Sequence, residues 1–404
     1  MLAGRPSHSG TTENPRPLPA WLLPTLMLVV AGGITAFFVL LARSEPARAW
    51  QIFLVNFLFW SGVAVAGVVL AAIFEVTSAR WPVPVKRLGE ACAAYLPVSY
   101  LLFLITWFGR HTLFPWADQP PQPNAAWLNV SFFFAREAVG LLVLYGAALL
   151  FSYHSLRRDV DTDPGQQNQP SAHASSDHAA LQKHAVALLI LYATMHTVFA
   201  WDFVMLLDPD WFSTLFGAYY FIGNLYLGLA ALTALTVFAC WRYNLGDTVH
   251  PKVFHNLGKL LFSFSLLWTY LFWSQYLVIW YGNLPRETGF ILVRTERAPW
   301  ATLAATILVT NFLVPFVILL FRAARENQKI LLASALVIAA GMWLERFLLV
   351  VPSITPEPRI FLGWEELMIT AGFFASFALT YITALQRLPG LTKLDVDGGD
   401  ISLR

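Results

Sequence analysis

The stretch WQIFLVNFLFWSGVAVAGVVLAAIF, residues 50–74, carries no charged side chain. A bilayer core of about 30 Å is crossed by roughly 20 apolar residues in helical conformation, so this stretch is long enough to span a membrane. Its apolar residues run continuously, without the alternation of a barrel strand. Because lipid offers no partner to free backbone groups, we predict that the stretch is an α-helix.

Similar apolar stretches precede and follow it along the chain. Together with 50–74 they predict about ten membrane-spanning helices, and hence an all-α polytopic membrane protein. The first follows Arg5 and Arg16 as a signal peptide would, but its apolar core is too long for one and is interpreted as a span. The other stretches are approximately 21–42, 88–109, 127–152, 182–206, 214–240, 254–281, 299–321, 329–351 and 362–386.

Composition supports this class of protein and excludes several others. The 404 residues are 57% hydrophobic and 12% charged, whereas a soluble domain carries roughly 25% charged residues. A net charge of +2 argues against a nucleic-acid partner and leaves membrane lipid as the expected surroundings. The two cysteines, Cys92 and Cys240, are too few for a four-cysteine iron–sulfur or zinc site, and both fall near the predicted cytoplasmic side, where a disulfide is not expected.

The distribution of Lys and Arg predicts the orientation. Loops on the side of the N-terminus hold more than twice as many of these residues as loops on the other side. The positive-inside rule therefore predicts a multi-pass protein of the inner (cytoplasmic) membrane with both termini in the cytoplasm and an even number of spans. The predicted organisation is a cytoplasmic tail 1–20, a transmembrane domain 21–386 with a disordered cytoplasmic loop 154–181, and a cytoplasmic tail 387–404.

Ionisable residues inside the spans are the candidate functional residues, because a charge at the bilayer centre costs at least about 2.5–3.5 kcal/mol. Arg136 and Glu137 are expected near the middle of their span, and Asp202 nearer the outer end of the next. Glu90 and Lys259 are expected at cytoplasmic helix ends. Candidates for a transmembrane proton relay are His196, Asp202, Glu137, Glu345, Arg346, Glu366 and Lys259.

Structural roles compete with this interpretation. Arg346 would form a buried ion pair with Glu365 or Glu366, and Arg136–Glu137 and Glu345–Arg346 would need partners on other helices because adjacent helical residues point apart. Glu90 and Lys259 are shallow enough to reach the interface. A single buried histidine is often a hydrogen-bonded core residue, and because His196 alone lies deep in a span, the paired ligands of a dihaem cytochrome b are not expected.

Two further features are open to more than one interpretation. Trp273, Gln275 and Tyr276 are candidate quinone contacts, although most aromatic residues in spans serve packing. The charged outer loop 282–299 is either a dock for an external subunit or a solvated loop.

Several segments between about 185 and 385 resemble a known family. They are HTVFAWDFVMLLDPDWFSTLFG at 196–217, LGKLLF at 257–262, WSQY at 273–276, IWYGNLPRET at 279–288, WLERF at 343–347 and VPS at 351–353. They resemble segments of the ActF subunits of alternative complex III, which belong to the NrfD/PsrC-like group of membrane subunits.

The resemblance implies two four-helix bundles with extra peripheral helices. It also implies a membrane subunit of a respiratory quinol:electron-acceptor oxidoreductase that contributes to quinone interaction or proton transfer without a redox cofactor of its own, with quinone as a possible ligand. The implied partners are a sister ActC-type subunit, an external iron–sulfur protein and c-type cytochromes. A structural anchor subunit of that complex and an autonomous secondary transporter are the alternatives. Residues matching family positions are Asp202, Asp208, Lys259, Gln275, Glu345 and Arg346.

Overall fold

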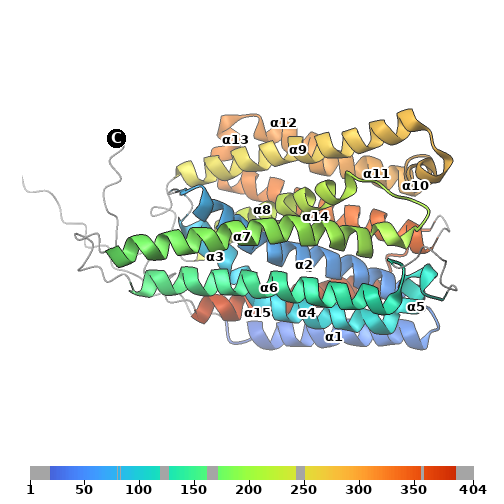
Figure 1. Cartoon of the computed structure of the whole chain (residues 1–404), viewed down its shortest axis with the longest axis horizontal. Coiled ribbons are helices and arrows are strands. Elements are labelled where there is room, and N and C mark those ends of the chain that lie inside the picture. The colour runs from blue at the N-terminus through green and yellow to red at the C-terminus, as the bar shows by residue number, and fades with distance from the viewer. Residues whose placement is uncertain are drawn as a thin grey trace, which may run out of the picture.

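The computed structural model of the chain describes residues 19–79, 81, 83–118, 127–161, 172–242, 251–355 and 359–387. In this part of the chain the regular structure is helical, and no strand is present. The long helices run along one axis and form a single elongated bundle (Figure 1). The prediction of an all-α polytopic membrane protein is confirmed.

The helices are connected by short 3₁₀ turns and by the short helix α5 (Arg110–Leu113). The bounds of the other helices are α1 (Leu22–Ala42), α2 (Pro46–Val76), α3 (Val83–Ala91), α4 (Leu96–Ile105), α6 (Val130–Asp161), α7 (Ala172–Phe203), α8 (Phe216–Arg242), α9 (Pro251–Gly282), α10 (Pro285–Thr295), α11 (Trp300–Leu308), α12 (Val314–Leu319), α13 (Arg322–Glu326), α14 (Gln328–Ile354) and α15 (Trp364–Arg387).

Nine helical segments of the described chain are long and apolar enough to cross a bilayer. They are α1, α2, the run from α3 to α5, α6, α7, α8, the run from α11 to α12, α14 and α15. Helix α9 is equally long, with 32 residues, and packs along α8 and α12. Its central stretch is rich in Trp, Tyr, Ser and Gln, which lowers its mean hydropathy. Helix α9 is therefore long enough to be the tenth span, but that assignment stays a prediction.

Packing groups the nine candidate spans and α9 into two four-helix bundles and a peripheral pair. The run α3–α5, α6 and α7 surround one side of α2, and α9, the run α11–α12 and α14 are grouped with α8. Helices α2 and α8 lie at the centre and pack on each other, and most of their side chains are buried. The peripheral helices α1 and α15 pair tightly with one another, with Gly33 against Gly372, as small residues permit in membrane helices.

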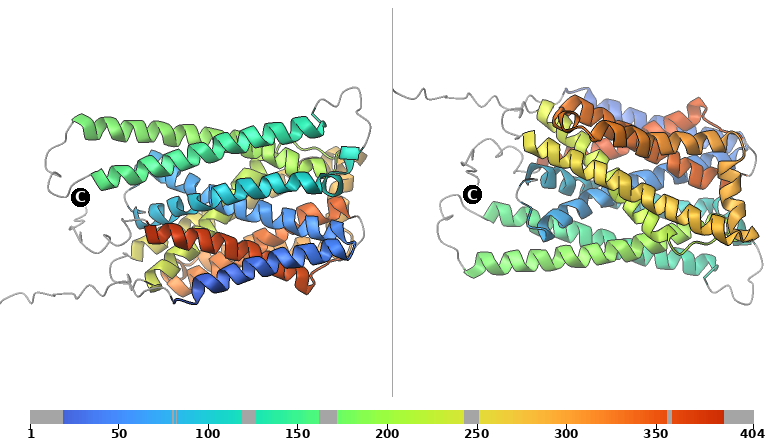
Figure 2. Two further views of the ribbon diagram at one scale, coloured as in Figure 1. Left: turned by 90° about the horizontal axis from the view of Figure 1, so that it is seen from below. Right: turned by 90° about the horizontal axis from the view of Figure 1, so that it is seen from above.

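The two ends of the bundle differ. Arg43, after the end of α1, pairs with Glu365 at the start of α15, so these helices are antiparallel. Helix α1 therefore begins, and α15 ends, at the same end of the bundle, as an even number of spans requires. We call this the α13 end, and the opposite end, where α10 lies across the bundle axis, the α10 end (Figures 1 and 2).

The polar segment 154–181 differs from the expected disordered loop. Helix α6 continues to Asp161 and α7 begins at Ala172, so both flanks of the segment are helical. The sequence AHASSDHAAL at 172–181 contains four alanines, the residue with the highest helix propensity. Residues 162–171 and the two predicted tails, apart from residues 19, 20 and 387, lie outside the described residues.

Proline breaks the helical hydrogen bonding in the eighth predicted span, and a π-helical turn, Val309–Leu313, joins α11 to α12 at this point. Pro315 has no N–H to offer the carbonyl four residues earlier, which belongs to Asn311. The Tyr226 hydroxyl of α8 donates to that carbonyl at 2.9 Å instead. The irregular turn is therefore held from the centre of the bundle.

Candidate functional site

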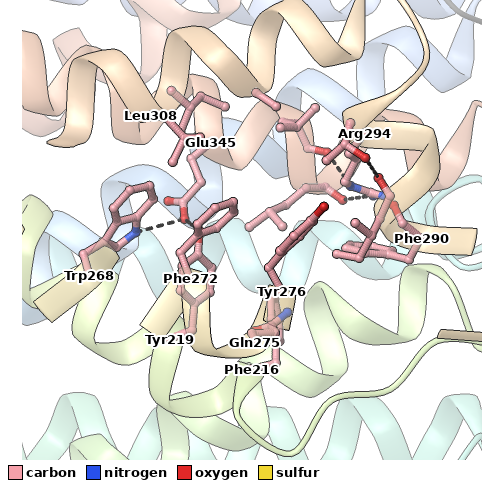
Figure 3. A pocket seen from close by; sticks show the side chains of 16 residues that line it. Phe216, Tyr219, Trp268, Phe272, Gln275, Tyr276, Phe290, Arg294, Leu308 and Glu345 are labelled. Atoms are coloured by element: carbon pink, nitrogen blue, oxygen red, sulfur yellow. Dashed lines mark hydrogen bonds between the residues drawn. The ribbon is translucent and has the colours of Figure 1, made fainter. Parts of the chain in front are cut away.

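A cavity lies among α8, α9, α10, α11 and α14 near the α10 end of the bundle (Figure 3). Its volume, counted as the space open to the centres of water molecules, is about 80 Å³. One water needs about 10–15 Å³ of such space, so the cavity has room for several waters or a flat ring. Most of the lining is apolar. The lining residues are Phe216, Tyr219, Trp268, Phe272, Gln275, Tyr276, Phe290, Ile291, Arg294, Thr295, Ala304, Ile307, Leu308, Glu345, Leu348 and Leu349.

Glu345 of α14 brings a carboxylate to this apolar wall, and its side chain is 3% exposed. Its Oε1 accepts hydrogen bonds from the Tyr219 hydroxyl and from Trp268 Nε1, the latter at 3.3 Å (Figure 3). Its Oε2 lies 3.2 Å from Nη1 of Arg346 and has no hydrogen-bond partner of good geometry among the described residues. One carboxylate oxygen is thus held in place while the other keeps capacity to accept a proton or a donor.

Arg346 is fully buried and supplies the charge that balances Glu345. Its Nη2 donates to Asn224 Oδ1 at 2.9 Å, and its guanidinium carbon lies 4.2 Å from the centroid of the Tyr220 ring. Asn224 and Tyr220 both belong to α8, so the arginine connects α14 to the central helix. Buried arginine is normally held by a carboxylate, hydrogen bonds and aromatic faces together.

One expectation about Arg346 was wrong. It does not pair with Glu365 or Glu366, which bind Arg43 and Arg48 near the α1–α2 connection. As expected, Glu345 and Arg346 have partners on another helix, Tyr219 and Asn224 of α8, but they also contact each other directly. The Cα–Cβ directions of adjacent helical residues diverge, but two long side chains on one helix can converge at their ends, where burial leaves no solvent to hold them apart.

Helix α10 closes one side of the cavity through Arg294, which is 6% exposed. Arg294 donates to the Leu348 and Leu349 carbonyls, each at 3.1 Å, and to Ser353 Oγ at 2.6 Å. The Leu348 carbonyl is free because Pro352, four residues later, has no N–H to donate to it. Burial lowers the pKa of the Arg294 guanidinium to about 9, and Asp208 partly offsets this. At neutral pH the side chain stays a cation that ties α10 to α14.

The outer loop predicted at 282–299 is therefore largely a helix, packed on the bundle by one face. Phe290 stacks on Trp211 with ring centroids 3.8 Å apart, and Arg286 pairs with Asp210 at 2.8 Å. The loop is neither simply solvated nor free of the bundle. Whether its exposed face docks an external subunit stays a prediction.

Two of the three candidate quinone contacts line the cavity. Gln275 is buried and its Oε1 has no hydrogen-bond partner among the described residues, and Tyr276 lies beside it on α9. Trp273 does not line the cavity; it is 55% exposed on the outer face of the same helix and stacks on Tyr276. Helical geometry places Trp273 and Gln275 on different faces of α9, because the two residues lie about 200° apart around a helix of 3.6 residues per turn.

A second polar cluster joins α6 to α7 closer to the α10 end than expected. Asp202 is fully buried and accepts two hydrogen bonds from Arg136, from Nε at 2.5 Å and from Nη2 at 2.7 Å, and one from Trp127 Nε1 at 3.0 Å. Glu137 is also buried and lies within electrostatic reach of Asp202 and Arg136. Arg136 and Glu137 lie in the second turn of α6 rather than near its middle, because the helix begins at Val130 and extends to Asp161.

The pair Asp202–Arg136 gives a stability prediction. Asp202→Asn removes the charge that holds the buried guanidinium but keeps one acceptor, so we expect a loss of about 2 kcal/mol in the free energy of unfolding. The matched control is Arg286→Gln, which breaks the exposed pair with Asp210 and should change stability by less than about 0.5 kcal/mol. Equilibrium unfolding of the purified protein in mixed micelles measures both. Equal effects of the two substitutions would show that Asp202 is not a structural tie.

The remaining relay candidates are dispersed. His196 is buried against Tyr192 and Phe199 and its Nδ1 lacks a hydrogen-bond partner among the described residues. Glu366 is bound to Arg48 at the α10 end, whereas Lys259 is exposed on α9 towards the α13 end. Glu90 is buried in an ion pair with Arg87 of the same helix rather than reaching the interface. None of these side chains lines the cavity.

Three residues of the site were missed by the sequence reasoning, namely Tyr219, Asn224 and Arg294. Tyr219 and Asn224 are uncharged, so a search for ionisable residues in spans passes over them. Arg294 was placed in the outer loop 282–299, which was interpreted either as a dock for an external subunit or as a solvated loop. A signal for it existed in Pro352, because a proline inside an apolar helix frees a carbonyl that a nearby donor must satisfy.

The fold and this site define an all-α polytopic membrane protein with a charged, hydrogen-bonded carboxylate in the wall of an apolar cavity. Within the residues that the structure describes, no group of three or more His, Cys, Asp or Glu side chains is placed to hold a metal ion. Both cysteines are buried and unpaired. Neither a protein-family model nor a curated protein sequence matches the chain.

Proposed function

We propose that this chain is an integral membrane subunit of a respiratory quinol:electron-acceptor oxidoreductase and that the α8–α14 cavity receives the quinol ring. The observation that carries the proposal is Glu345, a buried carboxylate held by Tyr219 and Trp268 at the wall of an otherwise apolar cavity. Such a pocket, with a few convergent polar groups, suits a flat and largely apolar ligand. The sequence resemblance to the ActF subunits supports the same class.

The cavity residues fit the chemistry of a quinol, which supplies two electrons and two protons when it is oxidised. Phe272 and Tyr276 offer aromatic faces for a ring. Gln275 Oε1 and Glu345 Oε2 are buried acceptors without hydrogen-bond partners among the described residues. Gln275 can therefore accept a hydrogen bond from a hydroxyl group, and the Glu345 carboxylate can also accept its proton. Arg346 Nη1 lies 3.2 Å from Glu345 Oε2, and a carboxylate positioned in this way suits the role of a general base.

Electrons would leave the site towards external partners. The cavity is lined by α10 and lies near the α10 end, which the Lys and Arg distribution predicts to be the outer side of the inner membrane, with both termini in the cytoplasm. An iron–sulfur protein and c-type cytochromes docked on this side, beside a sister ActC-type subunit, would place an acceptor near the ring. The polar face of α10, which carries Arg286, and the adjoining turn with Arg297 form the docking surface that we propose for them.

The proposal is tested by filling the cavity. Ala304→Trp places an indole in the lined volume, whereas Ala305→Trp places the same indole on the exposed face of α11. We expect decylubiquinone and menadione, titrated against the purified chain in detergent by quenching of tryptophan fluorescence, to bind the Ala304→Trp variant about tenfold or more weakly than wild type. Binding to Ala305→Trp should be unchanged. Equal binding by both variants would exclude this cavity as the quinone site.

A structural anchor is the second candidate, and the buried ion pairs favour it. Arg136–Asp202, Arg48–Glu366 and Arg43–Glu365 join helices that are distant in sequence, as a scaffold requires. An anchor predicts that substituting Glu345 changes the amount of assembled complex but not the turnover of each complex.

A further inference from the structure

A basic cluster lies at the α13 end, where α9 packs against α13. His255 of α9 lies within electrostatic reach of Lys259 on the same helix and of Arg322 and Arg325 of α13. The described counter-charge is Glu326, which accepts a hydrogen bond from Arg322 Nε at 2.7 Å and lies 3.7 Å from His255 Nδ1. Arg322 and Arg325 both lie within electrostatic reach of Glu326. The cluster therefore holds three cationic side chains and one described carboxylate.

Arg325 packs in this cluster, but its Nε donor has no hydrogen-bond partner among the described residues. A side chain on Gly258 would meet Cβ and Cγ of Arg325 at 2.8 Å, so the arginine stem lies flat against α9 because residue 258 is glycine. Arg325 Nε is buried and has no hydrogen-bond partner among the described residues, and the same is true of His255 Nδ1. Buried donors of this kind are normally matched by a partner, and an anion accepts from a guanidinium well.

An apolar surface continues from the cluster along the bundle. Helix α12 leads directly into α13 and also packs against α9, where Phe316 stacks on Phe262 with ring centroids 5.5 Å apart. Leu320 and Phe321, at the junction of α12 and α13, are 53% and 62% exposed. A ligand that bound both the basic cluster and this apolar surface would carry a negative group next to a long apolar part.

We propose that this α9–α13 cluster is a binding site for the phosphate headgroup of an anionic phospholipid, with the acyl chains on the exposed surface of α12. Basic pockets between helices at one membrane face bind such headgroups. A free phosphate would share the cationic contacts but not the apolar surface, which is why the observations favour a lipid. The site is separate from the quinone cavity and does not depend on the proposed function.

The test uses the full chain purified in detergent, with bound lipid counted by native mass spectrometry and stability followed by thermal unfolding. Phosphatidylglycerol or cardiolipin should bind saturably and raise the Tm, whereas phosphatidylcholine should not. The double variant Lys259→Gln/Arg322→Gln should bind about 25-fold more weakly, at about fivefold per cation removed. Glu326→Gln removes the counter-charge and should bind more tightly, which keeps the test decisive if the double variant fails to fold.

Arg297→Gln removes one exposed cation at the α10 end and is the matched control, with binding expected to equal wild type. Equal binding of anionic and zwitterionic lipid would overturn the proposal. So would unchanged binding in both the double variant and Glu326→Gln. A Tm increase reproduced in full by inorganic phosphate would also overturn it, since the site would then take a soluble anion rather than a lipid.

Discussion

Glu345→Gln should reduce quinol oxidation by the assembled complex by about 100-fold or more, because a positioned general base contributes 10²–10⁴-fold. The substitution keeps the shape of the side chain and can still accept hydrogen bonds from Tyr219 and Trp268. It removes the group that would take the proton from the ring. Turnover is measured with a reduced quinol substrate in membranes that contain the variant and is normalised to the amount of assembled complex.

The matched control for this experiment is Glu366→Gln. Glu366 is equally buried, 2% exposed against 3% for Glu345, but it is bound to Arg48 away from the cavity. We expect normal turnover per complex in the control variant. Normal turnover in Glu345→Gln would remove the proton-acceptor role and leave the anchor function as the better account. A fall in assembly alone, with unchanged turnover, would point the same way.

Arg346→Met should cause the largest loss of stability, about 3–5 kcal/mol in the free energy of unfolding. Methionine fills a similar volume, but it leaves the Glu345 carboxylate buried without its counter-charge, and breaking a buried pair at one partner costs this much. Asn224 loses its hydrogen bond at the same time. Equilibrium unfolding in mixed micelles measures the change, with detergent composition held constant.

The double variant Glu345→Gln/Arg346→Met separates charge from packing. If the loss comes from an uncompensated carboxylate, removing that charge should restore most of the stability, since a buried pair replaced as a whole is often nearly neutral. A double variant as unstable as Arg346→Met alone would contradict this explanation. It would show that the contacts of Arg346 with Asn224 and Tyr220 carry its contribution.

Residue types in the sequence predicted some of the cavity residues but not which way each side chain faces. Glu345 and Gln275 were singled out because polar groups in apolar spans need a reason to be there, and both lie at the cavity. Trp273 was grouped with them by its position in the chain, yet it faces outward. His196 and Lys259 met the same criterion as Glu345 and lie away from the cavity, because depth along a helix does not specify which neighbour a side chain faces.

Hydrophobicity along the chain was sufficient to determine the helical class, because lipid accepts few other structures, and the positions of nearly all the spans followed from it. The tertiary structure decided which charged side chains pair with one another. Arg346 finds Glu345 and Asn224 rather than Glu365, Asp202 takes Arg136, and α10 folds over the cavity through Arg294. The physical reason is that hydrophobicity is a property of one helix, whereas an ion pair depends on the rotation and offset of two helices, which are set by packing across the whole bundle.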